Sequence, residues 1–354
     1  MSAIYVLTAI FIFGFLVAIH ELGHFLAARL CGVRVNEFSI GMGPAVWHRQ
    51  WGETRYALRA LPVGGFCALE GEDEDTGDER SFARQNSWKK FIILMAGSIM
   101  NLLTGVVIIA CLYAGADGFY VDQVAGFSEG FPLEGEDGLM VGDVFYKIDG
   151  WRTYIRGDAA LFLRFNDGRG IDIEVIRDGK KIVLEDFPMY RGTYDGQPGR
   201  FGLSVGAALE PAGVLTTIRF IGFQTLDFIQ QVWFSLTQLV RGAVGVKDLS
   251  GPVGIVSTIT EVGKASESTL AAAENIAYFA ALIAINLSVM NLLPVPALDG
   301  GRILFLMIDG LAMLLFRRKI PERYQAAVNT VCFVLLMGVM LAVTLKDIAV
   351  LVNR

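Results

Sequence analysis

The stretch FLVAIHELGHFLAAR, residues 15–29, places two histidines and a glutamate inside an otherwise apolar run. The apolar character extends from residue 4 to residue 30, which is long enough for one helix to cross a hydrocarbon core of roughly 30 Å. An acidic group inside such a span costs roughly 2.5 to 3.5 kcal/mol on insertion scales, and such groups usually face a protein interior or a wet cavity. The stretch therefore predicts a membrane span that carries a polar site.

The spacing of these polar side chains is that of a metal site. On a helix, His20 and His24 lie one turn apart on the same face, with Glu21 about 100° away. Two imidazoles offer nitrogen ligands to zinc, which activates a water for attack on a peptide carbonyl while Glu21 accepts the proton. The chain has only three histidines, so core histidines explain this pentapeptide poorly. His48 has no partner at ligand spacing, and we expect it to be a surface residue.

Composition also indicates a membrane protein. Of the 354 residues 53% are apolar, and the mean hydropathy is +0.49. A net charge of −6 and a pI near 5.2, without any stripe of Lys and Arg, exclude nucleic acid as a partner. The N-terminal run has no Lys or Arg before Arg29 and is too long for a signal-peptide core, so we expect it to be retained. The four cysteines are far apart, which argues against a disulfide framework.

Four apolar runs are long enough to cross the lipid bilayer, at about residues 4–30, 91–116, 276–293 and 326–344. Lys and Arg near the span ends set the orientation, with nine in residues 29–90 and four in residues 317–323. Both segments are therefore expected in the cytoplasm. Both termini and the stretch between the second and third spans are then expected outside.

Residues 119–207 predict a small β-rich domain. The stretches GLMVGDVFYKIDGWRTY and IDIEVIRDGKKIVLEDF alternate apolar and polar residues and carry Asp-Gly turn signals. The core of the first stretch resembles a PDZ domain, which binds an extended peptide at a sheet edge; a spacer of similar strand content is the alternative. Residues 70–79 form an acidic block that we interpret as a solvated cytoplasmic loop.

Residues 213–245 favour an amphipathic helix at the membrane interface, because charged and amide side chains interrupt the apolar ones. A fifth span is the alternative. The predicted organisation is a membrane core in two parts, 1–118 with its cytoplasmic loop 31–90 and 270–354, around a PDZ-like domain at 119–207 and an amphipathic region at 208–269.

The stretch NLLPVPALDGG, residues 291–301, offers the third protein ligand that a catalytic zinc requires. Pro294 and Pro296 break the helix, and unpaired backbone groups at membrane depth are tolerated only where they line a cavity. Asp299 is the candidate ligand. The alternative is a helix end kinked by proline, with Asp299 as the cap of the next segment.

Together these motifs resemble the site-2 protease family of intramembrane zinc metalloproteases, in the bacterial type with an extracytoplasmic PDZ insert. GMGP at 41–44, LPVGGF at 61–66, AGSIMNLL at 96–103 and SGPVGI at 250–255 look like further landmarks in family order. The resemblance implies that His20, His24 and Asp299 are the zinc ligands and Glu21 the catalytic base. It implies a plasma-membrane protein of four transmembrane helices with a PDZ-like extracytoplasmic domain, a membrane-associated β-hairpin and an active site toward the cytoplasm.

Substrates implied by the resemblance are single-span membrane proteins, such as anti-sigma factors or remnant signal peptides, trimmed beforehand by a site-1-type protease. Such a substrate must unwind before cleavage. The stretch TRYALRALPVGGF, residues 54–66, alternates apolar and polar residues and has Gly64 and Gly65 near its end, so it can present backbone groups to an extended segment; an ordinary turn at the glycine pair is the alternative. Asn291 can bind the unwound strand or the developing oxyanion.

The chain departs from the family pattern in three places. It has room for one PDZ domain where well-known members carry two, the insert begins with the acidic PLEGEDGL, and Ser98 stands where proline is expected. The rival interpretation is a membrane adaptor that uses the PDZ-like domain to bind partners and a metal only to hold its spans together. Glu21 argues against it, because a structural zinc needs no base and usually has a fourth protein ligand. The donor set also accepts metals other than zinc.

Overall fold

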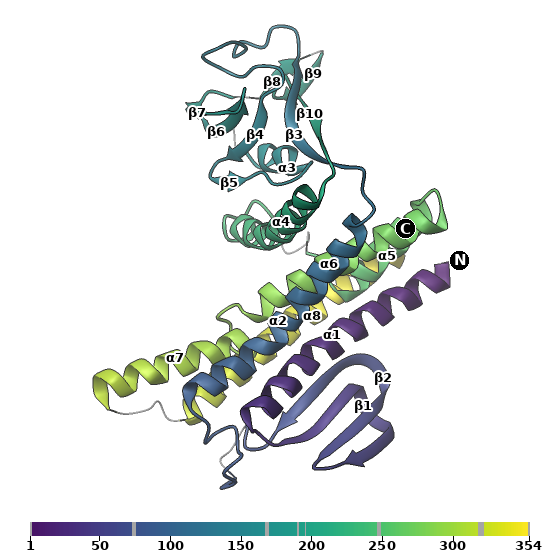
Figure 1. Ribbon diagram of the computed structural model, residues 1–354, viewed down its shortest axis with the longest axis vertical. Helices are drawn as coiled ribbons and strands as arrows, with labels where there is room; N and C mark the ends of the chain where they lie inside the picture. The colour runs from purple at the N-terminus through teal and green to yellow at the C-terminus, as the bar shows by residue number, and fades with distance from the viewer. Residues whose placement is uncertain are drawn as a thin grey trace. The chain divides into compact units, whose positions relative to one another are not determined.

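The computed structural model describes residues 2–72, 76–166, 170–189, 191–194, 196–245, 249–317 and 322–352. The chain divides into two compact units, one of residues 1–108 and 244–354 and the other of residues 109–243 (Figure 1). The first is called the helical unit here and the second the β unit. Of the acidic block 70–79, residues 73–75 lie outside the described residues.

The helices of the helical unit include the membrane spans. Their bounds are α1 (Ser2–Cys31), α2 (Ser87–Tyr113, which continues into the β unit), α5 (Pro252–Ala265), α6 (Thr269–Asn291), α7 (Asp299–Phe316) and α8 (Glu322–Val352). Among the described residues, four helices are long and apolar enough to cross a membrane: Ala3–Cys31, Ser87–Tyr113, Thr269–Asn291 and Tyr324–Val352. The first two predicted spans agree with these helices to within four residues, whereas α6 begins seven residues before the third predicted span and α8 extends eight residues beyond the fourth. The prediction of a polytopic membrane protein is thereby confirmed.

Small residues let three of these helices approach closely. A Cβ added to Gly23 of α1 would lie 2.4 Å from the carbonyl oxygen of Ala96 on α2, so the two backbones are nearly in contact. A Cβ on Gly105 of α2 would lie 2.6 Å from Ile285 on α6. Small residues at such crossings are typical of membrane helices, because association there depends on close packing. Helix α2 therefore packs against both α1 and α6.

The loop after α1 forms a curled sheet from two long strands, β1 (Val35–Trp51) and β2 (Thr54–Leu69). Each strand bends and pairs twice; Ser39, for example, pairs with both Ala57 and Phe66. The sheet therefore has four segments in the order 45–51, 54–59, 35–42 and 61–69. The predicted hairpin is present, and its last segment forms an edge beside α1.

The β unit is built around a six-stranded sheet. The strand order is β10-β3-β4-β6-β7, with β5 paired to β4. The strands of this sheet are β3 (Gly118–Phe127), β4 (Val144–Ile148), β5 (Trp151–Arg152), β6 (Ile171–Arg177), β7 (Lys180–Phe187) and β10 (Leu203–Pro211). The unit also contains helix α3 (Asp158–Arg164) and a separate two-stranded sheet of β8 (Gly192–Tyr194) and β9 (Gln197–Arg200). Val124, Ile148 and Ile173 are fully buried in its core, as the alternating pattern of the sequence requires.

Helix α4 (Val214–Val240) packs on this unit. Its Phe234 lies 5.1 Å, between ring centroids, from both Trp151 and Phe162, and Phe220 stacks on Phe119 at 4.5 Å. The helix is not among the four that meet the length and composition of a membrane span. One part of its apolar surface therefore has a protein partner, while Leu215, Ile218 and Trp233 remain exposed.

Candidate metal centre

Three ligand atoms from two distant parts of the chain converge in the helical unit. His20 and His24 lie on α1, and Asp299 is the first residue of α7. The Nε2 atoms of the two histidines are 3.1 Å apart, and Oδ2 of Asp299 lies 3.1 Å from the first and 3.3 Å from the second. Among the described residues, this is the group of His, Cys, Asp and Glu side chains that could hold a metal ion.

The donor set fits zinc. Two ligands at about 2.0 to 2.1 Å from a tetrahedral zinc are separated by about 3.3 Å, close to the spacing observed. Neutral imidazole nitrogens and a carboxylate oxygen all carry lone pairs, so their convergence is unfavourable unless a cation lies between them. The three side chains are mostly buried, with relative exposures of 11%, 12% and 18%. Three protein ligands leave a position for water, as a hydrolytic site requires.

Helix α2 orients the second histidine. Nδ1 of His24 donates to the carbonyl oxygen of Ile93 at 2.8 Å, which leaves Nε2 free to bind a metal. One turn further along α2, a Cβ added to Gly97 would lie 2.4 Å from Nε2 of His24 and 2.7 Å from the ring of His20. Gly97 therefore lets the α2 backbone lie directly against both imidazoles.

The segment between α6 and α7 brings Asp299 to the histidines. Ala297 has a φ of 77°, which is unusual for a residue with a side chain, and its N–H donates to Oδ1 of Asn329 on α8 at 3.2 Å. A Cβ on Gly300 would lie 2.2 Å from the carbonyl oxygen of Leu293, so only glycine fits there. The chain then enters α7, and a carboxylate in the first turn is favoured by the helix dipole.

Glu21 lies between the histidines and the sheet. The backbone N–H of Cys67 donates a hydrogen bond to its carboxylate. A Cβ on Gly65 would lie 3.5 Å from Cγ of Glu21 and 2.9 Å from the carbonyl oxygen of Ser39. The edge segment 61–69 therefore passes directly beside the predicted base.

The other predicted residues lie at different distances from this centre. Nδ2 of Asn291, the last residue of α6, is 3.5 Å from Nε2 of His20. Gly64 has a φ of 82° and packs on the side chain of Met42, so it turns the strand while Gly65 faces the base. His48 is exposed on β1.

The comparisons with known proteins agree with this geometry. The model of peptidase family M50 matches residues 8–339. The chain belongs to peptidase family M50. A Clostridium perfringens protein named as a candidate zinc metalloprotease is 35% identical over 346 residues, covering 97% of this chain and 98% of the relative. The sigma-W regulator protease RasP of Bacillus subtilis is 28% identical over 434 residues, covering 97% and 98%, and the chloroplastic membrane metalloprotease ARASP of Arabidopsis thaliana is 28% identical over 371 residues, covering 97% and 78%.

Peptidase family M50 contains the site-2 proteases, so the predicted resemblance and the predicted metalloprotease class are confirmed. The names of the relatives agree with zinc as the expected metal. Membership of a peptidase family favours the enzyme over the adaptor.

Several contacts in this M50 peptidase were not expected from sequence. The carbonyl of Ile93, the N–H of Cys67 and the approach of Gly97 all involve backbone, which no side-chain pattern reports. An ion pair between Arg302 and Glu72 also joins α7 to the turn after β2. Of these contacts, the approach of Gly97 is the one that the sequence could have indicated, because a glycine inside an apolar span is typical of close helix packing.

Proposed function

We propose that this M50 peptidase is a zinc endopeptidase that cleaves single-span membrane proteins within or near the bilayer, with His20, His24 and Asp299 as ligands. The observation that carries the proposal is the convergence of two Nε2 atoms and one Oδ2 atom within 3.1 to 3.3 Å of one another. Because the histidines belong to a helix of membrane-spanning length and composition, the site lies at the depth of a transmembrane substrate.

The chemistry is divided among four side chains. Zinc, when bound, supplies a Lewis acid that acidifies water and polarises the scissile carbonyl. Glu21 accepts the water proton at its carboxylate and returns it to the nitrogen of the leaving amine. Nδ2 of Asn291 donates to the oxygen on which negative charge develops. The Cys67 N–H holds the Glu21 carboxylate toward the histidines.

The edge segment 61–69 is the proposed holder of the substrate. A transmembrane helix has its carbonyls already hydrogen-bonded, so a segment must unwind before the base and water can reach it. Residues 61–69 pair on one side with residues 35–42. Their other edge can pair with an extended peptide. Gly65 would place that peptide beside Glu21, which is the support for Gly64 and Gly65 as substrate-binding residues.

The proposed location is a bacterial plasma membrane, with both termini outside and the active site toward the cytoplasm. The support is the concentration of Lys and Arg in residues 29–90 and 317–323. The histidines lie toward the end of α1 that enters residues 29–90. The name of the RasP relative refers to sigma-W regulation, which supports an anti-sigma factor as the class of substrate in regulated intramembrane proteolysis. A remnant signal peptide is the other class.

The β unit is the proposed PDZ-like filter, which excludes substrates that an upstream site-1-type protease has not trimmed. Its six-stranded sheet and helix α3 support this assignment. Because α4 packs on this sheet, the test removes residues 118–243 together. We expect the truncated protein to cut full-length and trimmed substrates equally, whereas the intact protein prefers the trimmed form. An unchanged preference would contradict the filter.

The catalytic assignment is tested with purified protein in detergent, measuring bound zinc and cleavage of a single-span substrate in the same samples. We expect Glu21→Gln to retain about one zinc per chain and to lose cleavage, because the ligands remain while the base is gone. His20→Ala should lose both. His48→Ala is the matched control, because His48 is exposed outside the centre, and it should behave as the wild type. Zinc without cleavage in the wild type, across several substrates, would favour the adaptor.

A further inference from the structure

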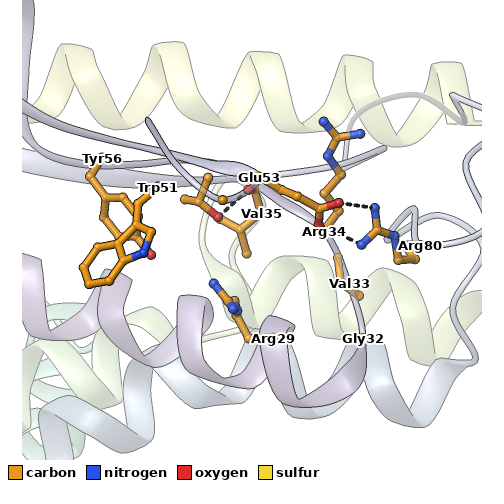
Figure 2. Close-up of a pocket in the computed structure, with 11 residues that line it drawn as sticks. Arg29, Gly32, Val33, Arg34, Val35, Trp51, Glu53, Tyr56 and Arg80 are labelled. Carbon is orange, nitrogen blue, oxygen red and sulfur yellow. Dashed lines mark hydrogen bonds and ion pairs between the residues drawn. The ribbon is translucent and has the colours of Figure 1, made fainter. Parts of the chain in front are cut away.

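A cavity of about 580 Å³ lies at the end of α1, away from the metal ligands (Figure 2). It is bounded by the last turn of α1, the start of β1, the turn between β1 and β2, and Arg80. Trp51 and Tyr56 lie at one end and Glu53 with Arg80 at the other, while Arg29 points from α1 into the space between them. The lining residues relevant here are Arg29, Arg34, Trp51, Glu53, Tyr56 and Arg80.

The lining of this cavity is positively charged. Arg80 donates to both carboxylate oxygens of Glu53, at 2.7 and 2.9 Å, and this pair is internally neutral. Nη1 of Arg34 lies 3.8 Å from Oδ2 of Asp78. Arg29 forms no ion pair within 4 Å among the residues that the structure describes, although its charge acts on the Glu53 carboxylate from further away; its guanidinium lies 5.7 Å from the ring centroid of Phe25. Arg80 and Arg34 thus each have an acidic partner, Glu53 and Asp78, and Arg29 is the lining arginine whose guanidinium is not in an ion pair and can bind an anionic ligand.

The position of the cavity indicates where that ligand comes from. Arg29 lies in the last turn of a helix of membrane-spanning composition, and the adjacent Leu30 is 89% exposed. Trp51, at the rim, is 77% exposed. Tryptophan, tyrosine and arginine at the end of a span are typical of the headgroup layer of a bilayer. The cavity therefore opens at the level of lipid headgroups.

We propose that this cavity binds the phosphate of an anionic glycerophospholipid headgroup. The guanidinium group of Arg29 matches phosphate oxygens in geometry and charge, and the aromatic wall of Trp51 and Tyr56 can contact the glycerol backbone. Cavities of this size suit a small ligand. Thr54 Oγ1, also in the lining, donates to the carbonyl oxygen of Val35 at 2.8 Å, which joins the start of β2 to the start of β1 at the cavity.

The test uses the full chain in detergent, titrated with dioleoylphosphatidylglycerol or dioleoylphosphatidylcholine and read by native mass spectrometry. We expect the wild type to retain phosphatidylglycerol selectively. Arg29→Gln should weaken this retention about tenfold, the usual effect of one charged hydrogen bond. Glu53→Gln should strengthen it, because the acid is removed and Arg80 is released. Arg49→Gln is the matched control, since Arg49 is exposed on the same sheet and does not line the cavity.

Zinc content serves as the check that each variant is folded. Equal retention by the wild type and by a zinc-loaded Arg29→Gln variant would overturn the proposal. An additional titration with inorganic phosphate separates the two sources of this chemistry. Binding of phosphate alone, with equal retention of the two lipids, would assign the cavity to a soluble phosphate and overturn the lipid.

Discussion

Gly97 of α2 lies against the ring of His24, with space for a hydrogen atom and no more. A Cβ at this position would be 2.4 Å from Nε2, the atom that faces the other ligands. We expect Gly97→Ala to lower zinc content and cleavage together, because the methyl group must displace an imidazole. Gly338→Ala is the control, since a Cβ on Gly338 of α8 would contact nothing within 4 Å. Full zinc and activity in Gly97→Ala would show that α2 can move away without cost.

Asn291 is predicted to stabilise the oxyanion of the reaction and not to bind the metal. Its Nδ2 lies 3.5 Å from His20 Nε2, beside the position where an oxyanion would form. Asn291→Ala should lower kcat about 100-fold, the effect of removing one oxyanion donor, with little change in KM or zinc content. Asn291→Asp should not restore turnover, because it offers no donor when ionised. Unchanged turnover in Asn291→Ala would remove this role.

The ion pair between Arg302 and Glu72 is predicted to position the sheet relative to α7. Arg302 lies one helical turn after Asp299, and Glu72 follows the last segment of β2. Each single charge reversal, Arg302→Glu or Glu72→Arg, should lower kcat severalfold while zinc content stays near one per chain. The double reversal should recover part of the loss, and a double-mutant cycle measures the coupling. Additive effects would mean that the pair does not act as a unit.

Asp347 on α8 binds the start of α5. Its Oδ2 accepts hydrogen bonds from the N–H groups of Gly251 at 2.8 Å and Gly254 at 2.9 Å, and the residue is 6% exposed. Asp347→Ala should lower the free energy of unfolding by about 1 to 3 kcal/mol, because buried donors lose their partner. Asp347→Asn keeps an acceptor oxygen and should retain most of the stability. A thermal shift in detergent that is equal for both variants would contradict this account.

The stability of the β unit is predicted to depend on pH through two buried acids. Asp158 of α3 and Asp227 of α4 lie close enough for their charges to interact, with exposures of 2% and 0%. Burial, followed by the charge of Asp158, raises the pKa of Asp227 to about 8. The folded state therefore holds a proton that the unfolded chain releases near pH 4, so stability falls as the pH rises from about 4 to 8 and then levels off.

Asp227→Asn mimics the protonated acid and should flatten this dependence. Trp151 packs on Phe234 of α4, so its fluorescence can report when α4 leaves the sheet. Melting temperatures between pH 5 and pH 9 would give the slope, with the exposed Glu185→Gln as the control. A slope that is equal in the wild type and Asp227→Asn would assign the proton to other groups.

The spans could be predicted from the sequence because their apolar runs are long. His20, Glu21, His24 and Asp299 could be predicted because HELGH and the proline-interrupted stretch 291–301 are unusual at membrane depth. It found Asn291 and Gly65 by position alone. The roles of all these residues stay predictions, although the structure places them together.

Other features depend on contacts that a one-dimensional pattern does not contain. Helix α7 is not among the predicted helices, since Asp299, Arg302 and Asp309 interrupt its apolar run. Strands β1 and β2 each bend into two segments, which gives the sheet its four segments. The alternation of apolar and polar residues does not show at which residues these bends occur. The amphipathic pattern of α4 did not reveal that Phe220 and Phe234 pack on the β unit, while Leu215, Ile218 and Trp233 are exposed; its position at a lipid interface stays a prediction.

The segment at the open edge of the curled sheet is also the segment whose backbone touches Glu21. A guest strand at that edge would be bound through its main chain, which is common to every amino acid. Under this arrangement the enzyme should accept targets of unrelated sequence and rank them by how little free energy their helices require to unwind. Glycine, proline or asparagine near the scissile bond would then promote cleavage, while an uninterrupted run of leucine would resist it.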